Sequence, residues 1–140
     1  MADQALTGIT ILDLSHTIAG PYCTKLFADH GAEVIKVEPP EGDPARSMGP
    51  FPNDDPHPEK SGLFLHLNTN KLGISLNLKT ATGVYIFKEL LKKADAVVES
   101  YSPGVMSELG LSYETLEKIN PQLVMTSITP FGQTGPYKDF

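Results

Sequence analysis

The sequence predicts an α/β domain whose sheet is mostly parallel and doubly wound. Five short runs are rich in apolar and β-branched residues, which is typical of strands buried on both faces. Segments with helical spacing of apolar residues separate most of these runs, and such connections favour right-handed crossovers between parallel strands. The expected strands are residues 9–14, 33–37, 73–78, 96–99 and 123–128.

The expected helices follow from start and stop signals. Pro21 should open the first helix, because proline suits the first helical position, where its missing N–H is not needed. Gly31 should end that helix. Thr80 is the expected N-cap of the second helix, whose apolar stripe includes Phe87 and Leu91. The expected helices cover residues 21–30, 80–93 and 112–119.

These elements describe one domain over residues 1–140 that resembles a Rossmann fold. Between residues 38 and 61 the chain carries seven prolines, so we expect a long loop without regular structure. Such a loop is usually functional or disordered, and the sequence does not decide between the two. Residues 63–67 are equally compatible with a short helix and a strand.

Composition and charge exclude several classes of protein. A net charge of −6 argues against broad nucleic-acid binding, which needs clustered Lys and Arg. No apolar run approaches the roughly 20 residues that span a bilayer. The first residues lack the pattern of a secretory signal, so a cytoplasmic protein is expected. The single cysteine, Cys23, lies among apolar neighbours and is expected to be a buried, inert thiol.

The general rule for open parallel sheets places ligands beyond the carboxyl ends of the strands. That rule selects three segments, residues 15–21, 76–79 and 100–104. Lys79 offers a compact charge for a phosphate, and Tyr101 offers a flat face for a nucleobase. The alternatives are a surface lysine and a tyrosine that fills the core.

No catalytic group can be assembled from the sequence alone. Asp13 is expected in or at the end of a strand, Asp29 on a helix exterior and Asp43 in the proline-rich loop. The four histidines are dispersed without partners at metal-ligand spacing, so no metal site is expected. The residues therefore predict a parallel α/β domain with an anionic or nucleotide ligand.

Segments along nearly the whole chain, taken in their sequence order, resemble those of a known family. The matching segments are residues 6–9, 12–16, 19–24, 26–38, 42–43, 68–71, 76–79, 94–104, 109–110, 120–121 and 131–136. Their residues, order and spacing are similar to the opening of the class III CoA transferases, the carnitine dehydratase and bile-acid-inducible family. The resemblance implies that the chain is the N-terminal part of the large domain of such an enzyme.

The resemblance also implies an activity. Enzymes of the family move coenzyme A from an acyl-CoA to a carboxylic acid through an aspartyl-CoA thioester, which is covalent catalysis by a carboxylate. The expected partners are therefore an acyl-CoA, a carboxylic acid and a second copy of the chain in an interlocked homodimer. The nucleophilic aspartate is expected beyond Phe140, so residues 1–140 should contain no catalytic residue and be inactive alone.

By position, the resemblance assigns coenzyme A contacts to the same three sheet-edge segments. The implied binding residues are Ile18, Ala19, Leu76, Asn77, Leu78, Lys79, Ser100, Tyr101 and Ser102. Some positions depart from the family. Ile18 stands where formyl-CoA transferases carry glutamine, and Ser100 replaces the more usual asparagine. Pro39 and Glu108 stand where the family can carry arginines for coenzyme A.

Other functions remain open at this level. Related enzymes on this scaffold racemise or dehydrate acyl-CoAs, also with residues expected downstream. A non-catalytic CoA-binding module is a second alternative. An unrelated nucleotide-dependent oxidoreductase is disfavoured, because the chain lacks a G-x-G-x-x-G pattern after its first strand.

Overall fold

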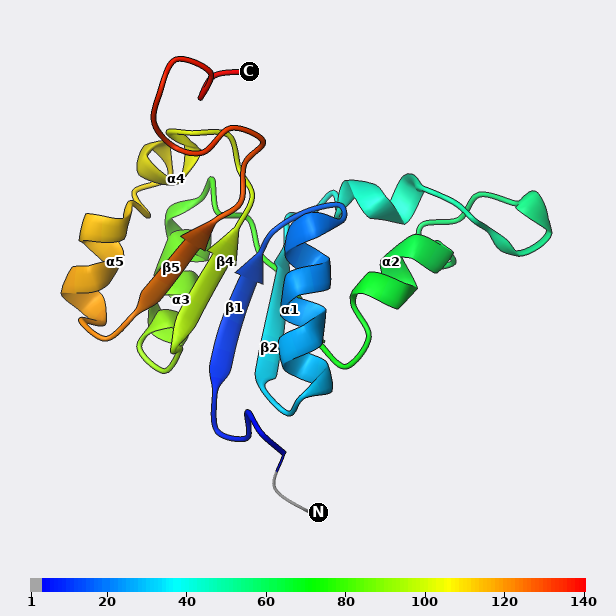
Figure 1. The fold of residues 1–140 in the computed structure, drawn as a ribbon, viewed down its shortest axis with the longest axis horizontal. Helices are drawn as coiled ribbons and strands as arrows, with labels where there is room; N and C mark the ends of the chain where they lie inside the picture. The colour runs from blue at the N-terminus through cyan, green and yellow to red at the C-terminus, as the bar shows by residue number, and fades with distance from the viewer. Residues whose placement is uncertain (1–3) are drawn as a thin grey trace.

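A five-stranded parallel sheet lies at the centre of the computed structural model, which describes residues 4–140 (Figure 1). The strands are β1 (Thr10–Leu14), β2 (Glu33–Glu38), β3 (Leu72–Ser75), β4 (Ala96–Glu99) and β5 (Val124–Ser127). They lie in the order β3-β2-β1-β4-β5, and every neighbouring pair is parallel. All five carboxyl ends therefore meet at one edge of the sheet, the upper edge in Figure 1.

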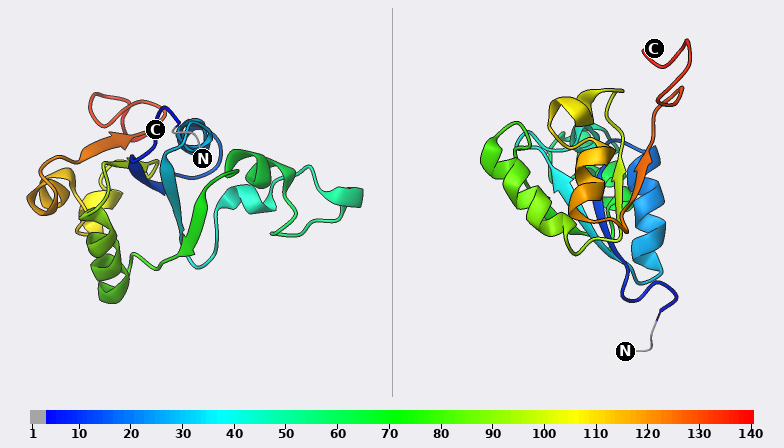
Figure 2. Two further views of the ribbon diagram at one scale, coloured as in Figure 1. Left: turned by 90° about the horizontal axis from the view of Figure 1, so that it is seen from below. Right: turned by 90° about the vertical axis from the view of Figure 1, so that its left-hand side faces the viewer.

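Helices cover both faces of this sheet, which confirms the doubly wound architecture (Figure 2). The helices are α1 (Ala19–Asp29), α2 (Gly62–Leu67), α3 (Ala81–Leu91), α4 (Val105–Glu108) and α5 (Tyr113–Ile119). Helix α1 packs on one face, and α3 and α5 pack on the other. Within residues 4–140, none of the helices has the length and apolar content that crossing a membrane requires.

The core consists of two apolar clusters, one on each face of the sheet. Successive side chains of β1 alternate between them, because neighbouring residues of a strand point to opposite faces. Ile11 packs with Ala28 of α1, whereas Leu12 belongs to the larger cluster around Phe87 and Leu91 of α3. Burying one such large side chain contributes about 1.5–3 kcal/mol. The apolar alternation therefore fixes which helix lies on which face.

Most element boundaries lie within one or two residues of those the sequence predicts, and two of the differences fall at the carboxyl edge of the sheet. Helix α1 begins at Ala19, so Pro21 is its third residue. Proline is tolerated there because the first turn of a helix has N–H groups without intrahelical partners. Strand β3 ends at Ser75, and Leu78 turns into the core. The expected cap at Thr80 is confirmed, since its hydroxyl accepts a hydrogen bond from the Gly83 N–H at 3.1 Å.

The proline-rich segment is more regular than expected. It contains two short 3-10 turns, Pro44–Ser47 and Pro52–Asp54, each opened by a proline. Asp43 caps the first turn by accepting from the Ala45 N–H. Residues 63–67 are helical, within α2. Proline favours the first position of these turns, because its ring fixes the φ angle near the helical value.

Four charged side chains are buried under α1, on the face of the sheet that this helix covers. Asp13 and Lys36 are partners in the register of β1 and β2, and both are almost fully buried. Lys71 Nζ lies 2.9 Å from Asp13 Oδ2, and Lys36 Nζ lies 2.8 Å from Asp43 Oδ2. We call Asp13, Lys36, Asp43 and Lys71 the buried charge network.

Both carboxyl groups of the network keep their negative charge. Burial alone would raise the pKa of Asp13, but the charges of Lys36 and Lys71 outweigh it and hold the pKa below its ordinary value. Burial opposes ionisation of Asp43 as well, and Lys36 together with backbone N–H donors lowers the pKa of that group. The network is therefore a set of paired charges and not a set of neutralised groups.

Removing one cation of the network should destabilise the fold strongly. Lys71→Met should lower the free energy of unfolding by about 3 kcal/mol, because a buried carboxylate then loses a partner. Urea denaturation measures this loss. Lys92→Met is the matched control, since Lys92 forms an ion pair with Glu89 in solvent and such pairs contribute little. Equal effects of the two substitutions would contradict the importance of the buried pairs.

The network should also make the fold sensitive to acid. Because the folded-state pKa values of Asp13 and Asp43 lie below the ordinary 3.8, the unfolded chain takes up protons first as the pH falls. The stability that the two ionised carboxylates contribute is fully present at pH values above the ordinary pKa of 3.8. It is lost as the pH falls through the lowered pKa values of the folded state. Urea midpoints measured from neutral to acidic pH should show this loss. Lys71→Met should lose less over the same range, and equal pH dependence would contradict the assignment.

Candidate functional site

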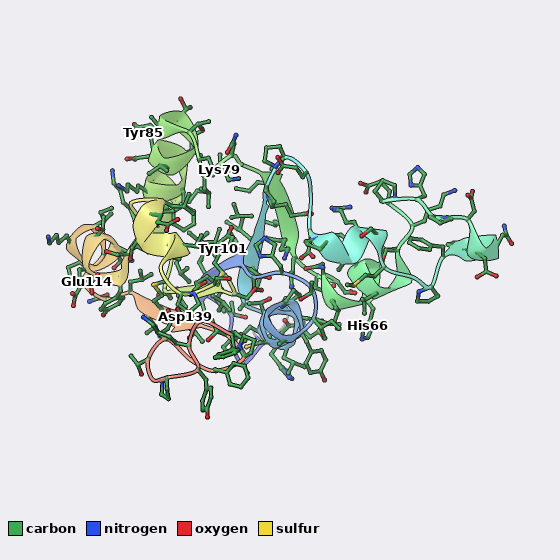
Figure 3. The ribbon with its side chains drawn as sticks, turned by 90° about the horizontal axis from the view of Figure 1, so that it is seen from above. His66, Lys79, Tyr85, Tyr101, Glu114 and Asp139 are labelled. Atoms are coloured by element: carbon green, nitrogen blue, oxygen red, sulfur yellow. The ribbon has the colours of Figure 1, made fainter. Side chains whose placement is uncertain are left out.

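A cavity of about 280 Å3 opens at the carboxyl edge of the sheet, beyond β2, β3 and β4. Two of the three segments selected from the sequence contribute to it. Its lining residues are Val37, Pro39, Glu41, Leu76, Asn77, Leu78, Lys79, Tyr101, Val105 and Leu109. Figure 3, which looks onto this edge, shows Lys79 and Tyr101 between α3 and β3, whereas His66 and Glu114 lie towards opposite sides. We call this cavity the Lys79 cavity.

The two residues with ligand chemistry in this cavity have different environments. Lys79 is exposed, and its side chain forms no ion pair with any residue from 4 to 140. Tyr101 is half-buried, and burial, together with the nearby charge of Glu99, raises the pKa of its phenol to about 12. Tyr101 is therefore a neutral aromatic surface at physiological pH, beside the exposed positive charge of Lys79.

The backbone of residues 76–79 is fixed against α3 by a close contact. A Cβ atom on Gly83 would lie 1.9 Å from the Asn77 carbonyl oxygen, so only glycine permits this approach. The Asn77 side chain accepts from the Lys79 N–H at 3.0 Å and stabilises the turn. Leu78 is buried beneath it. The turn thus presents Lys79 outward, while its neighbours serve the local structure.

A second cavity, of about 410 Å3, lies at the opening of α1. It is lined by His16, Thr17, Ala19, Gly20, Ser100, Ile128, Thr129 and Pro130. No side chain within residues 4–140 caps α1, and Pro21 has no N–H, so the Ala19 and Gly20 N–H groups give a partial positive charge beside this cavity. The His16 and Tyr101 rings meet edge to face, with centroids 5.0 Å apart, and join this cavity to the Lys79 cavity.

The remaining expected binding residues lie outside the Lys79 cavity. Ile18 is 53% exposed and lines neither of them. Ser102 lines a third cavity of about 420 Å3 with Glu99 and Gly104. Ser100 does line the second cavity, but its hydroxyl accepts from the His16 N–H at 2.8 Å. The structure thus places five of the nine expected residues in the Lys79 cavity and two, Ala19 and Ser100, in the second cavity, whereas Ile18 and Ser102 lie in neither.

Several residues of this edge could not be found from sequence patterns. His16 is half-buried, and burial lowers the pKa of its imidazole. Helix α4, with Val105 in the Lys79 cavity, has only one turn and gives no periodic signal. Cys23 is half-buried and not fully buried as expected, since the buried positions of α1 are Gly20, Pro21, Thr24 and Ala28. Asp29, in contrast, is exposed on α1 as expected.

Comparison with known proteins gives a consistent result. The model of CoA-transferase family III matches residues 6–140. Succinyl-CoA:glutarate CoA-transferase of Mus musculus is 50% identical over 135 residues, which are 95% of this chain and 30% of that protein. Acetyl-CoA:oxalate CoA-transferase of Acetobacter aceti is 45% identical over 130 residues, with 92% of this chain and 32% of that protein covered. The chain spans about a third of the length of such curated relatives.

Solved structures agree with the sequence comparison. A CAIB/BAIF family protein from Brucella suis superposes with a TM-score of 0.89 and 37% identity, over 99% of this chain and 36% of that one. Rv3272 from Mycobacterium tuberculosis also gives a TM-score of 0.89, with 33% identity over 100% of this chain and 38% of that one. On its sequence and its fold, the chain belongs to CoA-transferase family III.

Proposed function

We propose that this chain forms the part of a CoA transferase that holds the nucleotide end of an acyl-CoA, in the Lys79 cavity. The observation that carries the proposal is that Lys79 and Tyr101, 22 positions apart in the sequence, line one cavity at the carboxyl edge of the sheet. Lys79 forms no ion pair within residues 4–140, and Tyr101 is neutral. Lys79 would meet a phosphate, and Tyr101 would stack on adenine. Family membership supports a CoA thioester as the ligand.

The geometry also gives the ligand a direction. Tyr101 lines the Lys79 cavity, and His16, whose ring contacts that of Tyr101, lines the second cavity at the start of α1. The two cavities are therefore neighbours. The uncapped N–H groups there favour negative charge, such as a carboxylate or the oxyanion of a thioester under attack. We propose that the acyl end of the ligand lies on this side, and that Leu76 and Leu78 supply the apolar support for the nucleotide.

For the intact protein, we propose transfer of coenzyme A from the acyl-CoA to a carboxylic acid. An aspartate carboxylate outside residues 1–140 would attack the thioester, form a mixed anhydride with the acyl group and release the thiolate of coenzyme A. The thiolate would then attack the aspartyl carbonyl, which releases the donor acid and leaves an aspartyl-CoA thioester. The acceptor acid would repeat the two steps in reverse, so that the acceptor leaves as its CoA thioester and the aspartate is restored. The names of relatives include glutarate and oxalate as substrates. Dicarboxylic acids are therefore the first acceptors to test, by following acyl-CoA exchange with mass spectrometry.

Removing the Lys79 charge should weaken coenzyme A binding. Calorimetric titration of the intact protein should give a dissociation constant about tenfold higher for Lys79→Ala, because a charge-assisted contact to phosphate is lost. Added salt should weaken the wild type more than the variant, since the lost contact is electrostatic. Dephospho-CoA, tested in parallel, shows whether the 3′-phosphate is the group that Lys79 meets.

Two control variants make the result specific. Lys118→Ala removes a lysine in the last turn of α5, outside the Lys79 cavity, and should leave the affinity unchanged. Glu41→Gln removes a negative charge from the lining of the Lys79 cavity and should strengthen binding. If Lys79→Ala binds coenzyme A as tightly as the wild type does, the proposed site is wrong.

A further inference from the structure

Three consecutive residues of the loop between β1 and α1 are each held by a side chain from a different part of the fold. The contacts join the Ser15 carbonyl to Lys36 of β2, the His16 N–H to Ser100 after β4, and the Thr17 N–H to Asp43 of the proline-rich segment. The position of the loop therefore depends on three segments that are distant in sequence.

Thr17 holds the least favourable backbone conformation in this loop. Its φ angle is +61°, in the left-handed region that a β-branched residue rarely adopts. Its N–H donates to Asp43 Oδ1 at 3.0 Å, and its hydroxyl donates to the His16 carbonyl at 2.7 Å. A strained conformation persists only where the surroundings determine it, so these contacts are what keeps Thr17 in place.

Asp43 is itself fixed from several sides. It is 2% exposed, its Oδ2 accepts from Lys36 Nζ at 2.8 Å, and its Oδ1 also accepts from the Ala45 N–H at 2.8 Å. Its own backbone N–H donates to the Glu38 carboxylate at 2.9 Å. Because the Asp43 carboxylate is held by these hydrogen bonds, its bond to the Thr17 N–H fixes Thr17 relative to the proline-rich segment.

Thr17 lies directly before the start of α1, where the second cavity is located. Thr17 and Ala19 line the second cavity, and the Ile18 carbonyl accepts the first hydrogen bond of α1, from the Tyr22 N–H at 2.9 Å. The conformation of Thr17 therefore sets the direction in which α1 presents its free N–H groups. We infer that Asp43 is a positioning residue of the coenzyme A site: it holds Thr17 in the left-handed conformation and so aims the start of α1 at the ligand.

This inference rests on the proposed function, since it concerns the site proposed for coenzyme A. The competing explanation is that Asp43 only caps the 3-10 turn at Pro44–Ser47 and neutralises Lys36. The two explanations differ in what Thr17 contributes. If Asp43 acts through Thr17, a residue at position 17 that tolerates a positive φ angle should make Asp43 partly dispensable.

The test compares two double variants of the intact protein that both remove the buried Lys36–Asp43 charges. Lys36→Met with Asp43→Asn keeps an oxygen acceptor for the Thr17 N–H, whereas Lys36→Met with Asp43→Leu does not. Replacing both charges together avoids leaving one of them buried and unpaired. Calorimetric titration with succinyl-CoA, whose acyl carboxylate would lie at the opening of α1, should show about tenfold weaker binding for the Asp43→Leu pair than for the Asp43→Asn pair.

Adding Thr17→Gly to the Asp43→Leu pair should then restore affinity to within about threefold of the Asp43→Asn pair, because glycine adopts a positive φ angle without help. A residue that only supports the fold would not be rescued in this way. Should the Asp43→Leu pair fail to fold, as judged by circular dichroism, Asp43→Ser replaces Asp43→Leu in the same comparison. Serine removes the Oδ1 atom that accepts from both the Thr17 and the Ala45 N–H, but its hydroxyl can still cap the nearby Ala45 N–H, two residues on.

The outcomes separate the inference from the proposed function. Equal affinities for the Asp43→Asn and Asp43→Leu pairs, or no rescue by Thr17→Gly, would overturn the positioning role while the coenzyme A site stands. If wild-type protein does not bind coenzyme A at all, the proposed function is wrong and the inference falls with it. Asp95→Asn is the control at the opposite edge, since Asp95 accepts from the Thr10 N–H at 2.8 Å and should not affect binding.

Discussion

Two lysines buried against two aspartates hold together segments of this chain that lie far apart in the sequence. Lys71 reaches Asp13 across 58 positions, and Lys36 joins the end of β1 to Asp43. Buried charges destabilise a fold unless they are paired and hydrogen-bonded. Here each carboxylate has an ammonium partner and further donors, which keeps its pKa low. The loops at the carboxyl edge therefore cannot shift separately without exposing or orphaning a charge.

The apolar core and the charged groups have different effects in this fold. The two apolar clusters determine the sheet order and the helix faces, but they would tolerate small movements of the edge loops. The buried charge network fixes those loops, while Gly83 leaves room for the Asn77 carbonyl and Gly20 leaves room for the Ser15 side chain. Lys79 differs from Lys36 and Lys71 because it is exposed and unpaired among residues 4–140. In a chain of net charge −6, such local placement is what the proposed binding of an anionic ligand requires.

Local patterns were enough to predict the sheet and most helices, since runs such as residues 96–99 are short, apolar and β-branched. They could not predict that Lys36, inside a strand, would be buried, because its partner lies in a proline-rich segment whose path depends on tertiary contacts. The sheet-edge rule correctly brought residues 76–79 to Tyr101 in one cavity. It could not separate Ile18 and Ser102 from that cavity, since side-chain direction in loops has no period.

Amide hydrogen exchange of the intact protein without ligand tests the central claim most directly. The claim is that side chains of the carboxyl edge, among them buried charges, hold the loop of residues 15–17 in place in the absence of coenzyme A. The Ser15, His16 and Thr17 N–H groups each donate to a side chain of this edge. They should therefore exchange nearly as slowly as the core amide of Leu12 in β1. If they exchange as fast as the exposed amide of Gln133, the loop is not preorganised and the account is contradicted.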